Sequence, residues 1–171
     1  HVGRAVVELL RPYHCTVVVS DPFLTTDEAA RLGVAKVELD ELLASSDVVS
    51  LHAPALPATE RMIGVAELAR MFDGATLVNT ARGSLVDHDA LLAELRTGRL
   101  SAVLDVTDPE PLPPGHPLLG LANCVVTPHL AGAQGTELSR LAELLVEEVR
   151  RFAAGEPALY PVVAADQGRV A

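Results

Sequence analysis

Apolar residues recur along this chain in two alternating patterns. Short apolar runs with the β-branched content of buried parallel strands fall at residues 15–20, 47–51, 75–79, 101–106 and 124–127. Helical patterns of apolar residues lie between these runs, at about 26–32, 40–45, 65–71 and 88–96. Alternating strands and helices predict parallel strands joined by right-handed crossovers. We therefore expect the α/β class, with a doubly wound parallel sheet in which these runs are central strands.

Polar and special residues mark where several of these helices begin and end. A first helix is expected to stop near residue 11, because Pro12 cannot continue it. Thr25 and Glu28 have the spacing of a capping box, and Gly33 supplies the stop for the helix that they open. Asp87 stands where an N-cap of the 88–96 helix is expected.

The longest helical pattern runs from residue 136 to 153. Its apolar positions recur at helical spacing with Glu and Arg on the other face, so we expect this helix to pack through one stripe. That stripe consists of Leu138, Leu141, Ala142, Leu145, Val146, Val149 and Phe152. The segment after Gly155 contains two prolines and is expected to be irregular.

Composition and charge exclude several classes of partner. The chain has 171 residues, 49% of them hydrophobic, which is enough to bury a core. Its formal net charge of −10, with only 13 Lys and Arg, argues against a surface that binds nucleic acid. Without an apolar run of membrane-spanning length, we expect a soluble cytoplasmic protein with no membrane partner. Cys15 and Cys124 are expected to be buried thiols, and no metal site is indicated.

Three polar residues follow apolar strands and suggest chemistry. Arg82 lies in VNTARG, Glu110 in DVTDPEP and His129 in TPHLAG. Because the carboxyl ends of parallel strands share one edge of a sheet, these loops should bring a cation, a carboxylate and an imidazole together. Considered singly, each residue is also compatible with an ordinary exposed loop. The other histidines outside the strand ends, His14, His88 and His116, have no partners in sequence and are expected to face solvent.

The start of the chain resembles the second half of a dinucleotide-binding fingerprint. Gly3 opens a helix, as the last glycine of that fingerprint does, while the strand and the first two glycines are missing. Asp21 ends the next apolar run about 20 residues downstream, where an acidic residue binds the adenosine ribose and disfavours a 2′-phosphate. Two alternatives stay open: Gly3 as a helix-packing glycine, and Asp21 as a turn former before Pro22.

The segments SDPF, SLHAPALPATERMIG, VNTARGSLVD, LDVTDPEPL and TPHLAG occur in this order along the chain. Together they resemble the NAD-binding domain of the D-isomer specific 2-hydroxyacid dehydrogenases, over residues 1–163. The resemblance implies a Rossmann-like NAD-binding domain at 1–153 that lacks its first strand. It also implies a missing substrate domain, toward which residues 154–171 form an exit segment.

Within that resemblance, Arg82, Glu110 and His129 match the catalytic trio. They imply an NAD-dependent oxidoreductase that interconverts a small 2-hydroxy acid and its 2-keto acid. His129 would be the acid/base, Glu110 would orient it, and Arg82 would bind the carboxylate. Family members also dimerise, so a homodimer is expected. The implied cofactor-binding residues are His1, Val2, Gly3, Asp21, Ala53, Pro54, Thr59, Thr80, Ala81, Arg82, Asp105, His129 and Gly132.

Two other functions are compatible with these motifs. One is an NAD-sensing binding protein similar to the C-terminal-binding corepressors, which resemble these enzymes. The other is an inactive truncated fragment, because a sheet without its first strand would expose an apolar gap. A small departure from the family pattern also occurs, since Ala55 and Leu56 stand where Leu-Thr is common, which removes one hydroxyl but leaves Thr59.

Overall fold

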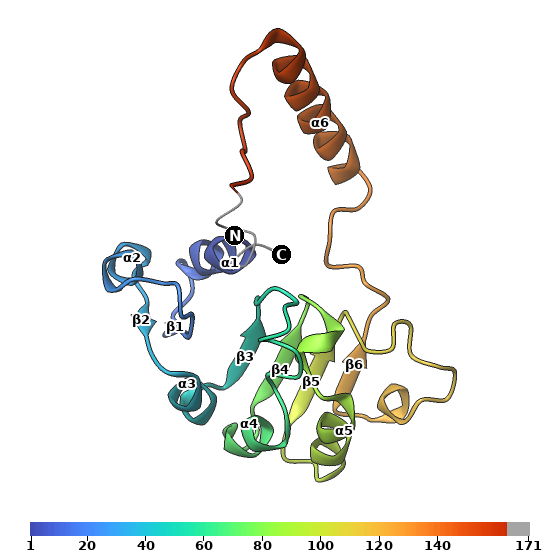
Figure 1. Ribbon diagram of the computed structural model, residues 1–171. Helices are drawn as coiled ribbons and strands as arrows, with labels where there is room; N and C mark the ends of the chain where they lie inside the picture. Colours follow the sequence, from blue (N-terminus) through green and yellow to red (C-terminus); the bar gives the residue numbers. More distant parts are fainter. Residues whose placement is uncertain (164–171) are drawn as a thin grey trace.

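Residues 1–163 are described by the computed structural model in Figure 1, and residues 164–171 of the expected exit segment lie outside the described residues. The helices are α1 (Val2–Leu10), α2 (Thr26–Leu32), α3 (Leu39–Ser45), α4 (Val65–Arg70), α5 (His88–Arg96) and α6 (Glu137–Ala154), with short 3-10 turns η1 (Gly83–Leu85) and η2 (Pro117–Gly120). The strands are β1 (Val18–Val19), β2 (Ala35–Lys36), β3 (Val48–Leu51), β4 (Thr76–Asn79), β5 (Ser101–Leu104) and β6 (Cys124–Val126).

A four-stranded parallel sheet in the order β3-β4-β5-β6 forms the body of the molecule (Figure 1). Neighbouring strands are consecutive in sequence, so each crossover connects a strand to the next one in the sheet. The crossover helices therefore form a row in which α4 packs between α3 and α5. Leu43, Leu77, Leu91 and Leu104 are fully buried between these layers. The α/β class and its parallel strands are thereby confirmed.

Strands β1 and β2 form a separate parallel pair that is not hydrogen-bonded to the larger sheet. The free edge of β3 faces this break, and Val48 there is 60% exposed. The expectation that every apolar run is a central strand is therefore wrong. Residues 15–20 contribute only a two-residue strand with partly exposed side chains, since a run without neighbours on both sides cannot be buried. Strand β2 carries no apolar run and was not expected.

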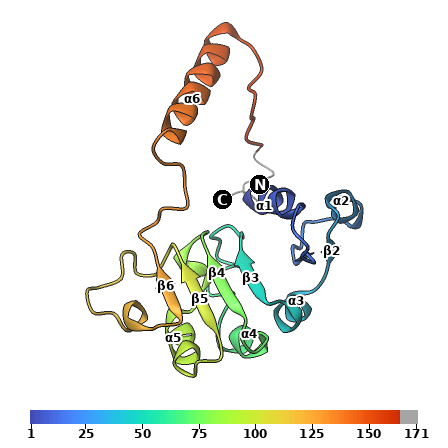
Figure 2. The same ribbon diagram turned by 180° about the vertical axis from the view of Figure 1, so that it is seen from behind.

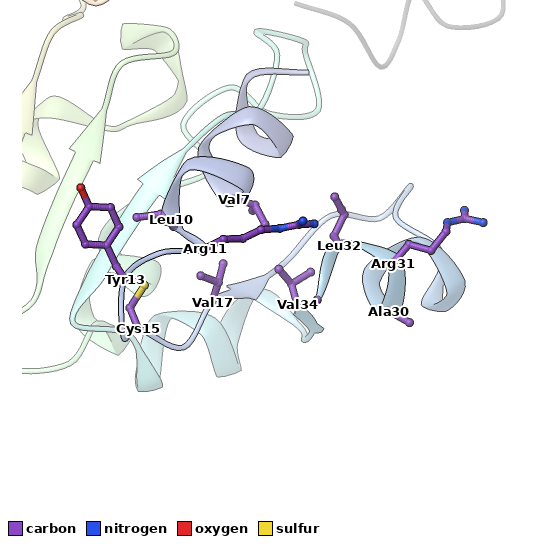
Figure 3. Close-up of a pocket in the computed structure, with 11 residues that line it drawn as sticks. Val7, Leu10, Arg11, Tyr13, Cys15, Val17, Ala30, Arg31, Leu32 and Val34 are labelled. Carbon is purple, nitrogen blue, oxygen red and sulfur yellow. The ribbon is translucent and has the colours of Figure 1, made fainter.

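Helices α1 and α2 and strands β1 and β2 make up an N-terminal unit. A cavity of about 290 Å³ lies in this unit, between α1, β1 and α2 (Figure 3). Its apolar lining comes mainly from Val7, Leu10, Val17 and Val34. None of the predicted site residues lines it. Cys15 borders the cavity but is exposed, so its prediction as a buried thiol is also wrong, while Cys124 is half-buried.

The predicted helix boundaries are confirmed at the positions where capping residues mark them. The Thr25 hydroxyl accepts from the Glu28 amide, and the Glu28 carboxylate accepts from the Thr25 amide at 2.9 Å. That backbone hydrogen bond, with further help from the Arg4 guanidinium, lowers the pKa of Glu28 to about 2. Gly33 ends α2 in the left-handed conformation with φ 73°, which a side chain would disfavour. Asp87 caps α5 by accepting from two amides of its first turn.

Arg99, just before β5, links the amino-terminal end of this strand to α4. Its guanidinium donates to the carbonyl oxygens of Leu68 and Met71, both at 2.6 Å, and so satisfies the end of that helix. Glu94 and Asp73 accept from the same guanidinium at 2.7 and 3.2 Å, and their hydrogen bonds raise the pKa of Arg99. These contacts join α4, α5 and the start of β5 without any residue of the predicted site.

Helix α6 stands clear of the sheet in both views (Figures 1 and 2). It forms where the periodicity predicted it, but none of its residues is buried. Leu145 is 65% exposed and Phe152 is 86% exposed, so the expected packing of its apolar stripe does not occur within the described residues. The loop after β6 leads the chain away from the sheet before α6 begins, which is why the stripe is not packed against the sheet. Leu159 and Tyr160 then fold back, and their amides donate to Glu148 on α6.

Candidate active site

The three candidate catalytic residues lie in loops that follow three adjacent strands. Arg82 comes after β4, Glu110 after β5 and His129 after β6, so all three loops leave the carboxyl edge of the sheet. Nδ1 of His129 lies 2.6 Å from Oε1 of Glu110. Both side chains are partly exposed, at 48% and 42%. The structure thus brings the predicted imidazole and carboxylate into direct contact at a surface open to a ligand.

His129 is held in an unusual backbone conformation. Its φ of 55° lies in the left-handed region, which non-glycine residues rarely adopt. Its amide donates to the Asp105 carbonyl oxygen at 2.9 Å, so the strand ends of β5 and β6 fix this conformation together. Strained conformations of this kind persist only where surrounding contacts determine them, and they concentrate at functional sites.

Asp105 organises the loop that carries His129. Asp105 is 4% exposed, and its carboxylate accepts from the amides of Leu130 and Ala131, at 2.7 and 2.8 Å, and from the Thr127 hydroxyl. Burial alone would raise the pKa of Asp105, but the hydrogen bonds from Thr127, Ala131 and Leu130 outweigh it and lower the pKa below its ordinary value. The carboxylate predicted to contact the cofactor is therefore engaged with the protein's own backbone.

Asn79 shapes the turn that presents Arg82. Its fully buried carboxamide accepts from the Ala81 amide at 3.0 Å and donates to the Arg82 carbonyl oxygen at 2.9 Å. The Arg82 guanidinium is exposed and donates only to the Ala81 carbonyl oxygen, with no acidic partner among residues 1–163. Thr80 and Ala81, predicted to bind cofactor, are half-buried in the same turn. The guanidinium thus remains available to an anionic ligand.

The expected pyrophosphate end lies at the start of α1. A Cβ at Gly3 would lie 3.3–3.4 Å from side-chain carbons of His52, which places the N-terminus of α1 beside the loop after β3 that holds Ala53 and Pro54. His1 provides no side-chain cap, and the first turn carries no acidic residue, so the first amides of α1 are open to an anion. This end of the molecule fits a dinucleotide phosphate. Burial lowers the pKa of His52, which favours its neutral form.

Two of the other predicted cofactor residues have additional local roles. Asp21 is exposed after β1, and one of its carboxylate oxygens accepts from the Phe23 amide at 2.8 Å, so the turn-forming alternative holds. The second oxygen accepts no hydrogen bond from the described part of the chain. The Thr59 hydroxyl donates to the Pro54 carbonyl oxygen at 2.6 Å and accepts from the Leu56 amide at 2.9 Å. Thr59 therefore braces the loop after β3. Gly132 is exposed just beyond His129.

Sequence reasoning missed Asn79 and misplaced His88. His88 is 8% exposed rather than solvent-facing. Its Nδ1 lies 3.1 Å from the Val86 carbonyl oxygen, and its Nε2 has no hydrogen-bond partner within residues 1–163. Burial lowers the pKa of His88. Asn79 could have been found as the polar residue that ends an otherwise apolar strand. No comparable signal existed for His88, because the first turn of a helix is usually exposed.

A parallel sheet with nucleotide-compatible loops at its carboxyl edge defines the Rossmann-like class of α/β domains. The sequence matches the model of the D-isomer specific 2-hydroxyacid dehydrogenase, NAD binding domain, over residues 1–131. The chain therefore belongs to this family and is an NAD-binding domain. Among the described residues, no helix combines the length and apolarity that a membrane span requires.

Relatives and solved structures agree with this assignment. The chain is 42% identical over 156 residues to a glyoxylate reductase of Korarchaeum cryptofilum, covering 91% of the chain and 47% of that protein. It is 37% identical over 157 residues to a D-3-phosphoglycerate dehydrogenase of Archaeoglobus fulgidus, covering 91% of the chain and 30% of that protein. The crystal structure of D-lactate dehydrogenase with NAD+ from Lactobacillus jensenii superposes with a TM-score of 0.85 at 30% identity, covering 95% of the chain and 53% of that structure. The chain thus spans about half or less of these proteins.

Proposed function

We propose that the protein carrying this chain is an NAD-dependent dehydrogenase that interconverts a small 2-hydroxy acid and its 2-keto acid. The observation that carries this proposal is the 2.6 Å contact between His129 and Glu110 at the carboxyl edge of an NAD-binding domain. Relatives named glyoxylate reductase and D-3-phosphoglycerate dehydrogenase support a short 2-oxo or 2-hydroxy carboxylate as substrate. The homodimer expected from the family is part of the same proposal.

His129 is the proton carrier in this mechanism. With Nδ1 directed at Glu110, Nε2 has no partner among the described residues and is free to face a substrate oxygen. In the oxidative direction, Nε2 takes the proton of the substrate hydroxyl as the carbonyl forms. In the reductive direction, the imidazolium returns that proton to the carbonyl oxygen. Glu110 fixes the ring orientation and stabilises the imidazolium, so it acts through His129.

Arg82 binds the carboxylate of the substrate. A guanidinium offers a planar fork of donors that matches the two oxygens of a carboxylate, and Arg82 has no competing acid in the described part of the chain. The turn held by Asn79 presents Arg82 at the end of β4, which is the neighbour of β5, the strand before Glu110. The substrate would then be held by its carboxylate while its 2-oxygen faces His129.

The residues present fit NAD at the other end of the site. The uncapped first turn of α1 would hold the pyrophosphate, and Asp21 would accept from the adenosine ribose through its open oxygen. NAD, when bound, supplies the hydride acceptor for oxidation, and its reduced form supplies the donor for reduction. Asp105, Thr59 and the Asn79 turn hold the loops around it in place.

The test uses the full-length protein that carries this chain. Loss of NADH absorbance is followed with glyoxylate, hydroxypyruvate, phosphohydroxypyruvate and pyruvate, with NADPH in place of NADH as the cofactor control. We expect turnover of at least one 2-keto acid, with NADH preferred because Asp21 repels a 2′-phosphate. NADH binding without turnover of any 2-keto acid would instead support an NAD-sensing binding protein.

A further inference from the structure

The backbone at Gly83 is pressed against the loop that leads to Glu110. A Cβ atom at residue 83 would overlap the carbonyl group of Thr107 and would lie 2.8 Å from the Asp108 amide nitrogen. Gly83 is buried, and it directly follows Arg82. The contact partners are backbone atoms, which cannot rotate away as a flexible side chain could. Only a glycine therefore allows the Arg82 loop and the Thr107 loop to approach this closely.

Each of these two loops is rigid on its own side of the contact. Asn79 brackets the turn before Gly83 through two hydrogen bonds, and its own carbonyl oxygen accepts from the Asp105 amide at 2.9 Å. Thr107 is 7% exposed, and its hydroxyl donates to the Pro109 carbonyl oxygen at 2.9 Å, which closes the turn immediately before Glu110. A side chain at residue 83 would therefore move the Arg82 loop and the Thr107 loop relative to each other, because neither loop can deform locally to accommodate it.

We infer that Gly83 and Thr107 are positioning residues that set the separation between the Arg82 guanidinium and the His129–Glu110 pair. Neither residue is needed as an acid, a base or a substrate ligand. Their contact fixes where the carboxylate of a 2-keto acid sits relative to the proton carrier, and misplacement by about 1 Å lowers a rate about a hundredfold. This role rests on the proposed dehydrogenase function.

The test compares Gly83→Ala with Gly120→Ala in the full-length protein. Gly120 has nothing within 4 Å of an added Cβ, so it is a matched control for the loss of glycine. We expect Gly83→Ala to lower kcat for the 2-keto acid about a hundredfold, while unfolding remains cooperative, at a lower midpoint, and NADH still binds. Gly120→Ala should retain wild-type kinetics. Wild-type kcat and KM in folded Gly83→Ala would overturn the inference.

A gentler pair of variants decides the matter if Gly83→Ala does not fold. Thr107→Val keeps the shape of the side chain but removes the hydrogen bond to Pro109, and we expect kcat to fall about five- to tenfold. Thr107→Ser restores the hydroxyl and should recover most of that loss. A Val variant as active as the wild type, or a Ser variant as impaired as the Val variant, contradicts a positioning role.

A readout independent of turnover separates this inference from the proposed function. The ring resonances of His129 are recorded by NMR in the wild type, in the Gly83 or Thr107 variant that folds, and in Gly120→Ala. Coupling between the loops predicts shifted His129 resonances in the first variant and unchanged ones in the control. If the wild type reduces no 2-keto acid, the dehydrogenase proposal fails, while unshifted resonances in the loop variant defeat the positioning contact.

Discussion

The imidazole of His129 meets the carboxylate of Glu110 through Nδ1, which lies 2.6 Å from Oε1. Glu110 sits in the loop after β5, whereas His129 follows β6, so the pair depends on the register between these two strands. The loop after β6 carries His129, and the loop after β5 carries the carboxylate that orients its ring.

Removal of His129 should abolish turnover and leave cofactor binding intact. We expect His129→Ala to lower kcat by about 10²- to 10⁴-fold, the usual contribution of an acid/base residue. Glu110→Gln retains a hydrogen-bonding side chain without the charge and should have a smaller effect than His129→Ala. Steady-state kinetics and NADH fluorescence titration measure both quantities. Normal turnover by His129→Ala would exclude the proposed role.

Substitution of Arg82 should act mainly on the substrate. Arg82→Lys keeps a positive charge but lacks the planar fork, so we expect the KM for the 2-keto acid to rise about tenfold or more. Arg82→Ala should abolish measurable turnover. Both variants should still bind NADH. An unchanged KM in Arg82→Lys contradicts carboxylate binding at this position.

Replacement of Asp105 by Asn should loosen the His129 loop. The carboxamide can accept fewer of the three hydrogen bonds, and we expect the free energy of unfolding to fall by about 2 kcal/mol. The pKa of Asp105 is lowered in the fold, so its contribution is fully present above the ordinary value of about 3.9 and is lost as pH falls through the lowered value. The stabilities of wild type and variant, measured by urea unfolding, should therefore converge as the pH is lowered below about 3.9.

Loss of the Arg99 side chain should affect stability without affecting the site. Arg99→Met removes two hydrogen bonds to the end of α4, and we expect the free energy of unfolding to fall by about 2 kcal/mol. Arg99→Lys can replace only part of this set and should be intermediate. The Kd for NADH and the kcat serve as controls, and a large change in either would show that this edge of the sheet is coupled to the site.

Buried His88 should make the fold sensitive to mild acid. Burial lowers the pKa of His88 in the folded state, so the unfolded chain binds a proton first as pH falls below the ordinary value of about 6.5. Acidification from about pH 7.5 to about pH 5.5 should therefore destabilise the wild type more than His88→Gln. Urea unfolding at both pH values provides the comparison. Equal losses in the two proteins would contradict a neutral buried imidazole in the fold.

Features that depend on neighbouring positions were predictable from the sequence. The strands around Leu77 and Leu104 are buried on one face and partly buried on the other, and both are visible in the sequence as apolar runs. The loops after these strands carry Arg82 and Glu110. The capping box of α2 was equally local. His129 could be placed at the same edge because parallel strands share their direction.

Features that depend on distant contacts were not predictable. The periodicity of α6 shows which face is apolar, but it cannot show that nothing covers Phe152 within the described residues. The Asp105 carboxylate could not be assigned to the amides of Leu130 and Ala131, because that contact depends on the path of a loop after another strand. The overlap that excludes a side chain at Gly83 likewise depends on a backbone position far along the chain.

The break between β1 and β3 has a consequence for how the domain holds its cofactor. Gly3 and Asp21 belong to the N-terminal unit, while Arg82, Glu110 and His129 belong to a body whose apolar core contains no residue before Leu39. A dinucleotide that reaches from Asp21 to His129 must span both parts and would act as a cross-brace between them. Part of its binding free energy is then used to hold the two units in a fixed relative position. Nucleotide affinity and the ordering of the two units are therefore thermodynamically linked.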